Sequence, residues 1–227
     1  MDPSKTRAIL FDLDGTLVDS APDLTAAVNR VLAERAQGPV SEAQVRDWTG
    51  DGTRRLVARA LMGGRDGEEP PEEALDGALE RFIAYYSEAV YVHSRPYPGA
   101  VEGLAQLARA GMRLAVVTNK PRHLADAILA HMGAAGSIDT VVGGDSTDTR
   151  KPDPEPLRLA MEGLGAASST ALMVGDSATD VEAARNAGIP VVCVPYGYRR
   201  GAAVEALGAD GVIEAITELP SLLRGAA

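Results

Sequence analysis

The feature that most constrains this chain is a short apolar run that leads into two acidic residues. Residues Ala8–Phe11 are all apolar, and Asp12 and Asp14 follow them, with a glycine at Gly15. An uninterrupted apolar run of this length is typical of a strand that is buried on both faces. In open α/β sheets, ligands bind outside the carboxyl ends of the strands, so we expect both acids to face a binding site. Two carboxylates this close repel each other, and a cation would relieve that repulsion.

From residue 96 onward the chain alternates between helical and strand patterns. Apolar strand segments are expected at 113–117, 141–142, 171–174 and 191–194. Amphipathic segments separate them, which is typical of βαβ units and a parallel sheet. We therefore predict an α/β fold whose core is a doubly wound, Rossmann-like parallel sheet.

A block of helical patterns interrupts this core near its start. No strand pattern occurs between Leu17 and Tyr91, whereas Ser20 and Ser41 each stand where the N-cap of a helix is expected. We predict a catalytic core of residues 1–17 and 96–227, with an inserted all-helical cap domain at 18–95. Because both ends of the block lie beside the acids, the cap is expected to cover the site and exclude water.

Polar residues stand at the ends of several predicted strands. Asp12, Thr118 and Asp176 each end an apolar run, and Lys151 stands just before a predicted helix. Strand ends of a parallel sheet meet at one edge, so these side chains are expected to converge there. A lysine and a hydroxyl beside carboxylates can neutralise and hold phosphoryl oxygens.

Four of the converging residues are acidic, namely Asp12, Asp14, Asp176 and Asp180. Two like charges about 4 Å apart repel by roughly 4 kcal/mol at an effective dielectric constant of about 20. The cluster therefore needs a cation, or some of its carboxyl groups must protonate. Ligands that are all oxygen, with no supporting histidine, favour Mg²⁺.

The residues around the first acids also resemble a known family. Asp12–Ser20 reads Asp-Leu-Asp-Gly-Thr-Leu-Val-Asp-Ser, which resembles the first motif of the haloacid dehalogenase-like superfamily. Thr118, Lys151 and Asp176 follow in the order of that superfamily, and the resemblance covers nearly the whole chain. With its cap sequence, the chain is most similar to the bacterial phosphoglycolate phosphatases. The resemblance implies a Mg²⁺-dependent phosphatase that hydrolyses a small phosphorylated metabolite, above all 2-phosphoglycolate.

The resemblance also implies a set of metal ligands. These are the carboxylate of Asp12, the backbone carbonyl of Asp14 and the carboxylate of Asp176. Asp180 is expected to stand behind them, where it accepts hydrogen bonds from metal-bound waters or from Lys151.

The resemblance further implies roles in phosphoryl transfer for these residues. Asp12 is expected to attack phosphorus and form an aspartyl phosphate, which divides hydrolysis into two displacements. Asp14 is expected to protonate the leaving alkoxide and later to take a proton from the attacking water. Thr118, Asn119 and Lys151 are expected to bind the transferred phosphoryl group.

We expect a loop in the predicted cap to bind the part of the substrate that remains after the phosphoryl group, namely its glycolate end. Residues 48–53 resemble the cap loop of phosphoglycolate phosphatases and lead into a helix, whose N-terminus offers N–H groups to an anion. Asp51 departs from what an anionic substrate would favour, because it adds a negative charge. The expected substrate-binding residues of the cap are Gly50, Gly52, Thr53, Arg54 and Arg55.

Composition narrows the choice of partners. The net charge is −10 and the pI is about 4.8, which argues against nucleic acid and anionic membranes as partners. The single cysteine, Cys193, excludes an internal disulfide. No long apolar segment precedes the first strand, so we expect a cytoplasmic protein. The sequence leaves monomer and homodimer open.

Several other functions remain open at this stage. A sugar-phosphate phosphatase or a phosphomutase of the same superfamily would use the same acids. A receiver-type signalling domain also combines acids, a threonine and a lysine around a phosphorylated aspartate, although it needs no helical cap. Cys193 and Arg199 have the spacing of cysteine-dependent phosphatases, but Pro195 and two tyrosines replace the phosphate-binding loop of those enzymes.

Overall fold

Within the described residues, six parallel strands form one sheet in the order β5-β4-β1-β6-β7-β8. The computed structural model describes residues 5–65, 67–199 and 201–223, so the outer ends of the predicted core lie outside the described residues. β1 occupies the centre, where Phe11 is aligned with Val116 on one side and Val174 on the other. The predicted parallel α/β sheet is thus confirmed. The strands are β1 (Ala8–Phe11), β4 (Arg113–Val117), β5 (Thr140–Val142), β6 (Ala171–Gly175), β7 (Val191–Cys193) and β8 (Gly211–Val212).

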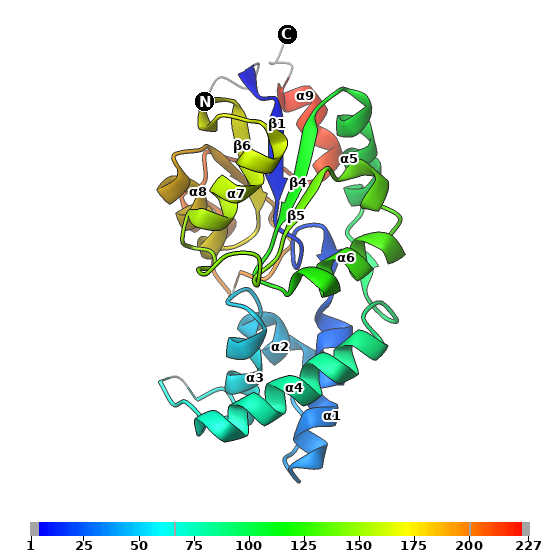
Figure 1. The fold of residues 1–227 in the computed structure, drawn as a ribbon, viewed down its shortest axis with the longest axis vertical. Coiled ribbons are helices and arrows are strands. Elements are labelled where there is room, and N and C mark those ends of the chain that lie inside the picture. The colour runs from blue at the N-terminus through cyan, green and yellow to red at the C-terminus, as the bar shows by residue number, and fades with distance from the viewer. Residues whose placement is uncertain (1–4, 66, 200, 224–227) are drawn as a thin grey trace.

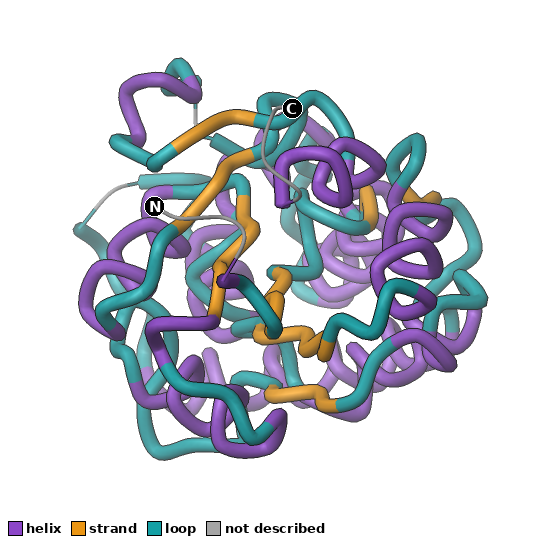
Figure 2. Tube along the Cα trace, turned by 90° about the horizontal axis from the view of Figure 1, so that it is seen from above, coloured by secondary structure: helices purple, strands orange, loops and turns teal. Residues whose placement is uncertain are grey.

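Helices cover both faces of this sheet, as Figure 2 shows from above. Ile9 and Phe11 point into one apolar cluster, whereas Ala8 and Leu10 point into another, so β1 is buried on both sides. This explains why its sequence shows no polar alternation. The helices on the first face are α5 (Ala100–Arg109), α6 (Arg122–His131) and α9 (Leu219–Leu223), and those on the second are α7 (Glu155–Leu164) and α8 (Ala178–Ala187).

A second group of helices lies below the carboxyl edge of the sheet in Figure 1. It contains α1 (Ala21–Glu34), α2 (Glu42–Trp48), α3 (Thr53–Leu61) and α4 (Glu72–Glu88). Two short strands, β2 (Val18–Asp19) and β3 (Arg95–Pro96), pair antiparallel where the chain enters and leaves this group. The expectation that no strand lies between Leu17 and Tyr91 is therefore wrong at β2, because two residues are too few to produce a sequence pattern.

One apolar cluster joins the two groups of elements. It runs from Phe11 and Leu13 through Leu17 to Leu24 and Phe82, all of which are buried. Shared burial of this kind holds the inserted helices against the sheet. Among the described helices, none is both long enough and apolar enough to cross a membrane.

The two predicted helix caps have different outcomes. Ser41 forms the expected capping box at the start of α2. Ser20 stands at the N-cap of α1, but its hydroxyl donates to Asp14 rather than capping the helix. The hydroxyl of Tyr198 caps α1 instead, since it accepts from the backbone N–H groups of Ser20 and Ala21 at 2.9 and 3.0 Å.

Asp23, in the first turn of α1, fixes the segment that returns from the helices to the sheet. Its carboxylate accepts from the backbone N–H groups of Val92, His93 and Ser94 at 2.8–2.9 Å, and from the Ser94 hydroxyl at 2.6 Å. The carboxylate is buried, and a buried donor without its acceptor is costly.

We therefore expect Asp23→Ala to lower the free energy of unfolding by about 2 kcal/mol or more, because it leaves the buried N–H and hydroxyl of Ser94 without their acceptor. Urea denaturation measures this change. Asp47→Ala, which removes an exposed carboxylate from α2, is the matched control and should change stability by less than about 0.5 kcal/mol. Equal effects of the two substitutions would contradict the assignment.

Candidate active site

Asp12 lies directly after β1, at the centre of the carboxyl edge of the sheet. Its backbone N–H donates to the carbonyl of Val174 at 2.9 Å, so strand-like pairing continues up to this residue. The chain then turns at Gly15, whose φ of +94° favours glycine. Asp12 and Asp14 are both buried and both line one small pocket. The structure thus brings the two acids together where the sequence predicted.

Lys151 reaches Asp12 from the loop that precedes α7. Its Nζ lies 2.7 Å from Asp12 Oδ1 and 2.7 Å from Asp180 Oδ1. The lysine side chain is only 2% exposed, and a buried ammonium needs partners of this kind. Lys151 therefore joins the end of β1 to the first turn of α8.

Asp176 follows β6 and lies next to these groups. Its carboxylate accepts from the Thr16 hydroxyl at 2.8 Å and from the backbone N–H of Tyr198 at 2.5 Å. A Cβ at Gly15 or at Gly197 would collide with this carboxylate, so the two glycines allow the backbone to pass close to it. Two separate segments, residues 15–16 and 197–198, thus fix Asp176.

Asp180, in the first turn of α8, has both carboxylate oxygens occupied. Oδ1 accepts from Lys151, and Oδ2 accepts from the Ser177 hydroxyl at 2.7 Å and from the Ser177 backbone N–H at 3.1 Å. Asp180 therefore positions Lys151 at the base of the site.

The three acids form one compact group. Oxygen atoms of Asp12, Asp176 and Asp180 all lie within 4.8 Å of one another. Burial raises the pKa of Asp12 to about 7, although Lys151 counteracts this, and burial together with Asp180 and Asp12 raises the pKa of Asp176 well above its usual value. The group thus carries more negative charge than Lys151 offsets. A buried donor set made only of oxygens fits a hard divalent cation.

Thr118 and Asn119 follow β4, on the other side of Asp12. The Thr118 hydroxyl accepts from the backbone N–H of Lys120 at 3.2 Å. Asn119 Nδ2 donates to the carbonyls of Gly50 and Lys151 at 3.0 Å each, and its Oδ1 accepts from the Lys151 N–H at 3.0 Å. The Asn119 side chain thus ties the inserted helices and the Lys151 loop to the end of β4.

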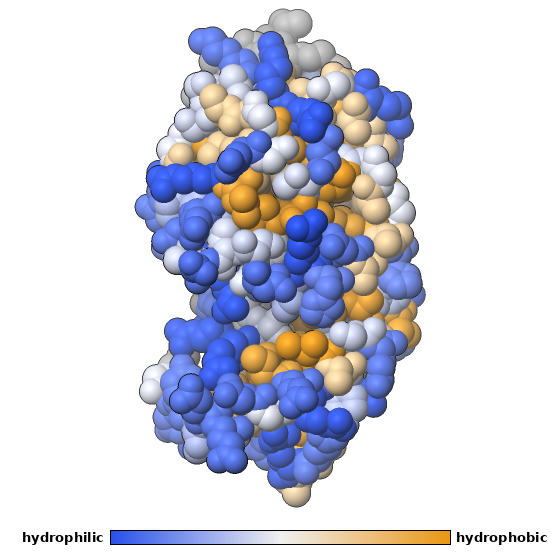
Figure 3. Space-filling model, in the orientation of Figure 1, coloured by the Kyte–Doolittle hydropathy of each residue, from blue (hydrophilic) through white to orange (hydrophobic). Residues whose placement is uncertain are grey.

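The loop before α3 closes over this edge. Gly50, Gly52 and Thr53 line the same pocket as Asp12 and Thr118. The pocket has a volume of only about 30 Å³, roughly that of one water molecule, so the inserted helices lie tightly over the acids. The constriction between the two parts of the molecule is visible in Figure 3.

The structure does not bring Arg54 and Arg55 to this pocket. Arg54 pairs with Asp76 at 2.5 Å and Arg55 pairs with Glu69 at 2.7 Å, and all four side chains are exposed. Neither arginine is among the residues that line the pocket. The two predicted cap residues thus lie apart from Gly50, Gly52 and Thr53.

Asp51, the acid that departs from the family's cap loop, has a partner in α3. Arg59 donates to Asp51 Oδ2 at 2.6 Å and to the carbonyl of Trp48 at 2.9 Å. The negative charge of the loop is therefore balanced locally.

The sequence did not predict the pocket residue Lys120 or its neighbour Tyr86. Lys120 Nζ lies 2.5 Å from Asp14 Oδ1 and 3.0 Å from the hydroxyl of Tyr86 in α4. Burial works against its charge, but Asp14 and Tyr86 hold the pKa of Lys120 above its usual value. Burial raises the pKa of Tyr86 to about 12, although Lys120 opposes this shift. Lys120, like Thr118, follows the end of a strand pattern in the sequence, whereas no sequence signal connects Tyr86 to the site.

Cys193 and Arg199 do not form a second phosphatase site. Cys193 is buried in β7, and burial raises the pKa of its thiol to about 12. Arg199 donates to the carbonyl of Ala202 at 2.8 Å. A thiol in this environment behaves as a small apolar side chain.

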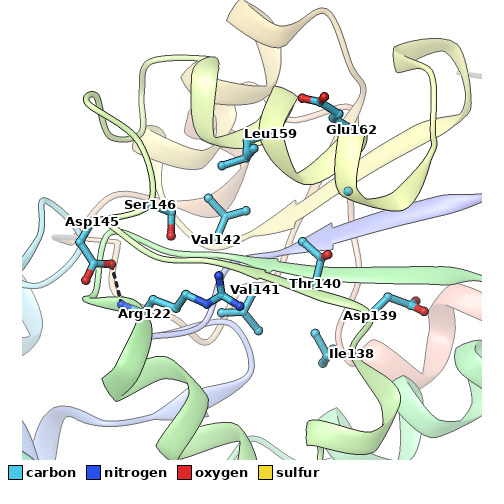
Figure 4. A pocket seen from close by; sticks show the side chains of 11 residues that line it. Arg122, Ile138, Asp139, Thr140, Val141, Val142, Asp145, Ser146, Leu159 and Glu162 are labelled. Carbon is cyan, nitrogen blue, oxygen red and sulfur yellow. Dashed lines mark hydrogen bonds between the residues drawn. The ribbon is translucent and has the colours of Figure 1, made fainter.

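A larger groove of about 760 Å³ runs along the edge strand β5, away from the acids. Figure 4 shows Leu159 and Glu162 of α7 on one side and Arg122, whose backbone N–H donates to Asp145, on the other. Apolar residues are exposed over this part of the sheet in Figure 3. The groove holds none of the acids that converge at the carboxyl edge.

The sequence and the structure of this chain are both similar to those of known proteins. Residues 9–194 match a family described as haloacid dehalogenase-like hydrolase. Phosphoglycolate phosphatase from Rhodospirillum rubrum is 46% identical over 216 residues, which cover 94% of this chain and 89% of that protein. A crystal structure from Haemophilus somnus, described as a predicted phosphoglycolate phosphatase, has a TM-score of 0.87 at 33% identity and covers 96% of this chain and 98% of its own. CbbY from Rhodobacter sphaeroides, solved in complex with phosphate, has a TM-score of 0.75 at 29% identity, with coverage of 94% and 96%.

The acid cluster predicts a specific pH dependence of stability. In a chelating buffer, the folded state keeps a proton on Asp12 up to about pH 7, whereas the unfolded state loses it near 3.8. Stability is therefore lost as the pH rises between these values, because the unfolded state binds fewer protons there. We expect the deprotonation of Asp12 to lower the melting temperature by about 5–10 °C between about pH 5 and about pH 7.5.

The Asp12→Asn variant provides the comparison, since it cannot ionise at this position. Its melting temperature should change less over the same range, and a saturating divalent cation should flatten the curve of the unmodified protein. The same pH dependence in both proteins would contradict the shifted pKa.

Proposed function

The chain belongs to the haloacid dehalogenase-like hydrolase family, and from this premise we propose that it hydrolyses 2-phosphoglycolate to glycolate and phosphate through an aspartyl phosphate. The chain is a phosphatase of this family. Its substrate is a small phosphorylated metabolite. The proposal concerns the identity of that substrate, the metal and the roles of individual residues.

One observation carries the proposal: Asp12 stands in contact with Lys151 and within 4.8 Å of two further carboxylates at the carboxyl edge of the sheet. A carboxylate held beside an ammonium is oriented as a nucleophile for an electrophilic phosphorus. The lysine can then neutralise phosphoryl oxygens that the carboxylate alone would repel.

We assign Mg²⁺ to the acid cluster. The carboxylates of Asp12 and Asp176 and the backbone carbonyl of Asp14 would hold it, because all are hard oxygen donors. When bound, the ion supplies positive charge that neutralises the phosphoryl oxygens and orients them. Asp180 is already engaged by Lys151 and Ser177, which supports a positioning role for it rather than direct ligation.

In the first step, an Asp12 oxygen forms a bond to phosphorus while the bond from phosphorus to the ester oxygen breaks. Asp14 gives its proton to that leaving oxygen. The Ser20 hydroxyl, which donates to Asp14 Oδ1, orients this carboxyl group. Lys151 and the Thr118 hydroxyl, together with neighbouring backbone N–H groups, hold the phosphoryl oxygens in line with Asp12.

In the second step, water attacks the aspartyl phosphate and Asp14 takes up its proton. The bond between phosphorus and Asp12 then breaks and phosphate leaves. The small pocket beneath the inserted helices supports this sequence, because exclusion of bulk water would protect the intermediate until the leaving group has departed.

We propose that helices α1–α4, within residues 18–95, act as a cap that selects the substrate. Gly50, Gly52 and Thr53 place the N-terminus of α3 at the pocket, and a helix N-terminus favours an anionic group. The names of relatives at 37–46% identity further support 2-phosphoglycolate. A cytoplasmic location stays an expectation from the sequence.

Release of phosphate from a panel of phosphomonoesters tests this proposal. With Mg²⁺ present, 2-phosphoglycolate should have the highest kcat/KM, and a chelator should abolish turnover. Asp12→Asn should lower kcat by at least about 1,000-fold, because it removes the nucleophile. Asp14→Asn should lower kcat by about 100- to 10,000-fold through the loss of acid–base catalysis.

Asp47→Asn, which neutralises an exposed carboxylate of α2, is the matched control and should leave kcat unchanged. Preference for a sugar phosphate would refute 2-phosphoglycolate as the substrate but would not contradict the proposed mechanism. Formation of an isomeric phosphate ester instead of free phosphate would identify a mutase. Turnover by Asp12→Asn near that of the unmodified enzyme would refute the mechanism.

A further inference from the structure

Lys120 carries a buried positive charge, and the mechanism proposed above gives this residue no role. It lines the pocket together with Asp14 and the cap loop, and only 5% of its surface is exposed. Burying an ammonium group is costly, so its presence in the pocket calls for a reason beyond packing.

The contacts of Lys120 hold its ammonium at the junction of sheet and cap. Nζ donates to Asp14 Oδ1 and to the hydroxyl of Tyr86, and it lies 4.9 Å from the centre of the Tyr86 ring. An ammonium has three donor hydrogens, and these two contacts use two of them. The third is available to a ligand in the pocket.

The charges around the pocket single out Lys120. Among the described residues that line it, Lys120 is the one with a positive charge, whereas Asp12 and Asp14 are acidic. The arginines nearest in sequence to the cap loop, Arg54 and Arg55, pair with exposed acids instead. Lys151 is bonded to Asp12 and Asp180, on the phosphoryl side of the site.

The chemistry of the substrate fits this position. In 2-phosphoglycolate, one methylene group separates the ester oxygen from the carboxylate. Asp14 must contact that ester oxygen if it protonates the leaving group. A cation in contact with Asp14 therefore lies within reach of the substrate carboxylate.

We propose that Lys120 binds the substrate carboxylate, oriented by the Tyr86 hydroxyl, and so selects phosphorylated hydroxy acids over neutral phosphomonoesters of the same size. This inference rests on the proposed function. In this inference a residue of the core, Lys120, binds the substrate carboxylate, and the cap residue Tyr86 positions Lys120.

Two substrates of nearly equal size test the inference. They are 2-phosphoglycolate and 2-hydroxyethyl phosphate, in which a hydroxymethyl group replaces the carboxylate. Lys120→Met should lower kcat/KM for 2-phosphoglycolate by about 30- to 100-fold, mainly through KM, because a charge-assisted hydrogen bond is lost. For 2-hydroxyethyl phosphate, kcat/KM should change by no more than about threefold, since this substrate has no carboxylate for Lys120 to bind.

Tyr86→Phe is the second variant, and it keeps the proposal testable if Lys120→Met does not fold. It retains the lysine and the ring but removes the orienting hydroxyl, so we expect a several-fold rise in KM for 2-phosphoglycolate alone. Arg158→Met, which removes an exposed positive charge from α7, is the matched control and should affect neither substrate. Thermal unfolding of each variant confirms folding.

The outcomes separate this inference from the proposed function. If the unmodified enzyme does not prefer 2-phosphoglycolate to 2-hydroxyethyl phosphate, the proposed substrate is wrong. If it does, but Lys120→Met slows both substrates equally, Lys120 acts on Asp14 or on packing and the inference alone is overturned. Loss of the preference in Arg54→Met or Arg55→Met, with Lys120→Met unchanged, would overturn it as well.

Discussion

The contact of Lys151 with Asp12 and Asp180 is the interaction on which the rest of the site depends. It joins residues from the end of β1, the loop before α7 and the start of α8, all of them buried. Buried ion pairs of this kind add little to stability, because desolvation offsets their attraction. Their value here is positional, since the parallel sheet places Asp12 at its centre and Lys151 fixes the direction in which that carboxylate points. Asp176 lies close enough to Asp12 and Asp180 for the three carboxylates to form a cluster that could hold a cation.

A second set of contacts ties the inserted helices to the same edge. Asp14 accepts from Ser20 at the start of α1 and from Lys120, which in turn contacts Tyr86 of α4. Asn119 holds the carbonyl of Gly50, so the loop before α3 is fixed to the end of β4. The residue that we propose as acid and base is thus held by both parts of the molecule. Movement of the helices would change the surroundings of Asp14 directly, whereas Asp12 and Lys151 belong to the core alone.

Much of this arrangement follows from the sequence, because it depends on local patterns. Apolar runs locate the strands, and the topology of a parallel sheet then brings Asp12, Thr118 and Asp176 to one edge. Contacts between side chains distant in sequence carry no such pattern, which is why Tyr86 and the capping role of Tyr198 were missed. The sequence also does not show in which direction a side chain on a helix points. Arg54 and Arg55 directly follow the cap loop in sequence, but their side chains pair with Asp76 and Glu69.

Detection of phosphate on Asp12 tests the central claim most directly. Acetyl phosphate can phosphorylate an Asp14→Asn variant without a general acid, because its leaving group needs no proton, whereas hydrolysis of the intermediate lacks its base. After an acid quench, mass spectrometry of the peptides should find one phosphoryl group on the peptide that contains Asp12, and none when Asp12→Asn is added. Full release of phosphate with no phosphorylated peptide at any time would contradict the account.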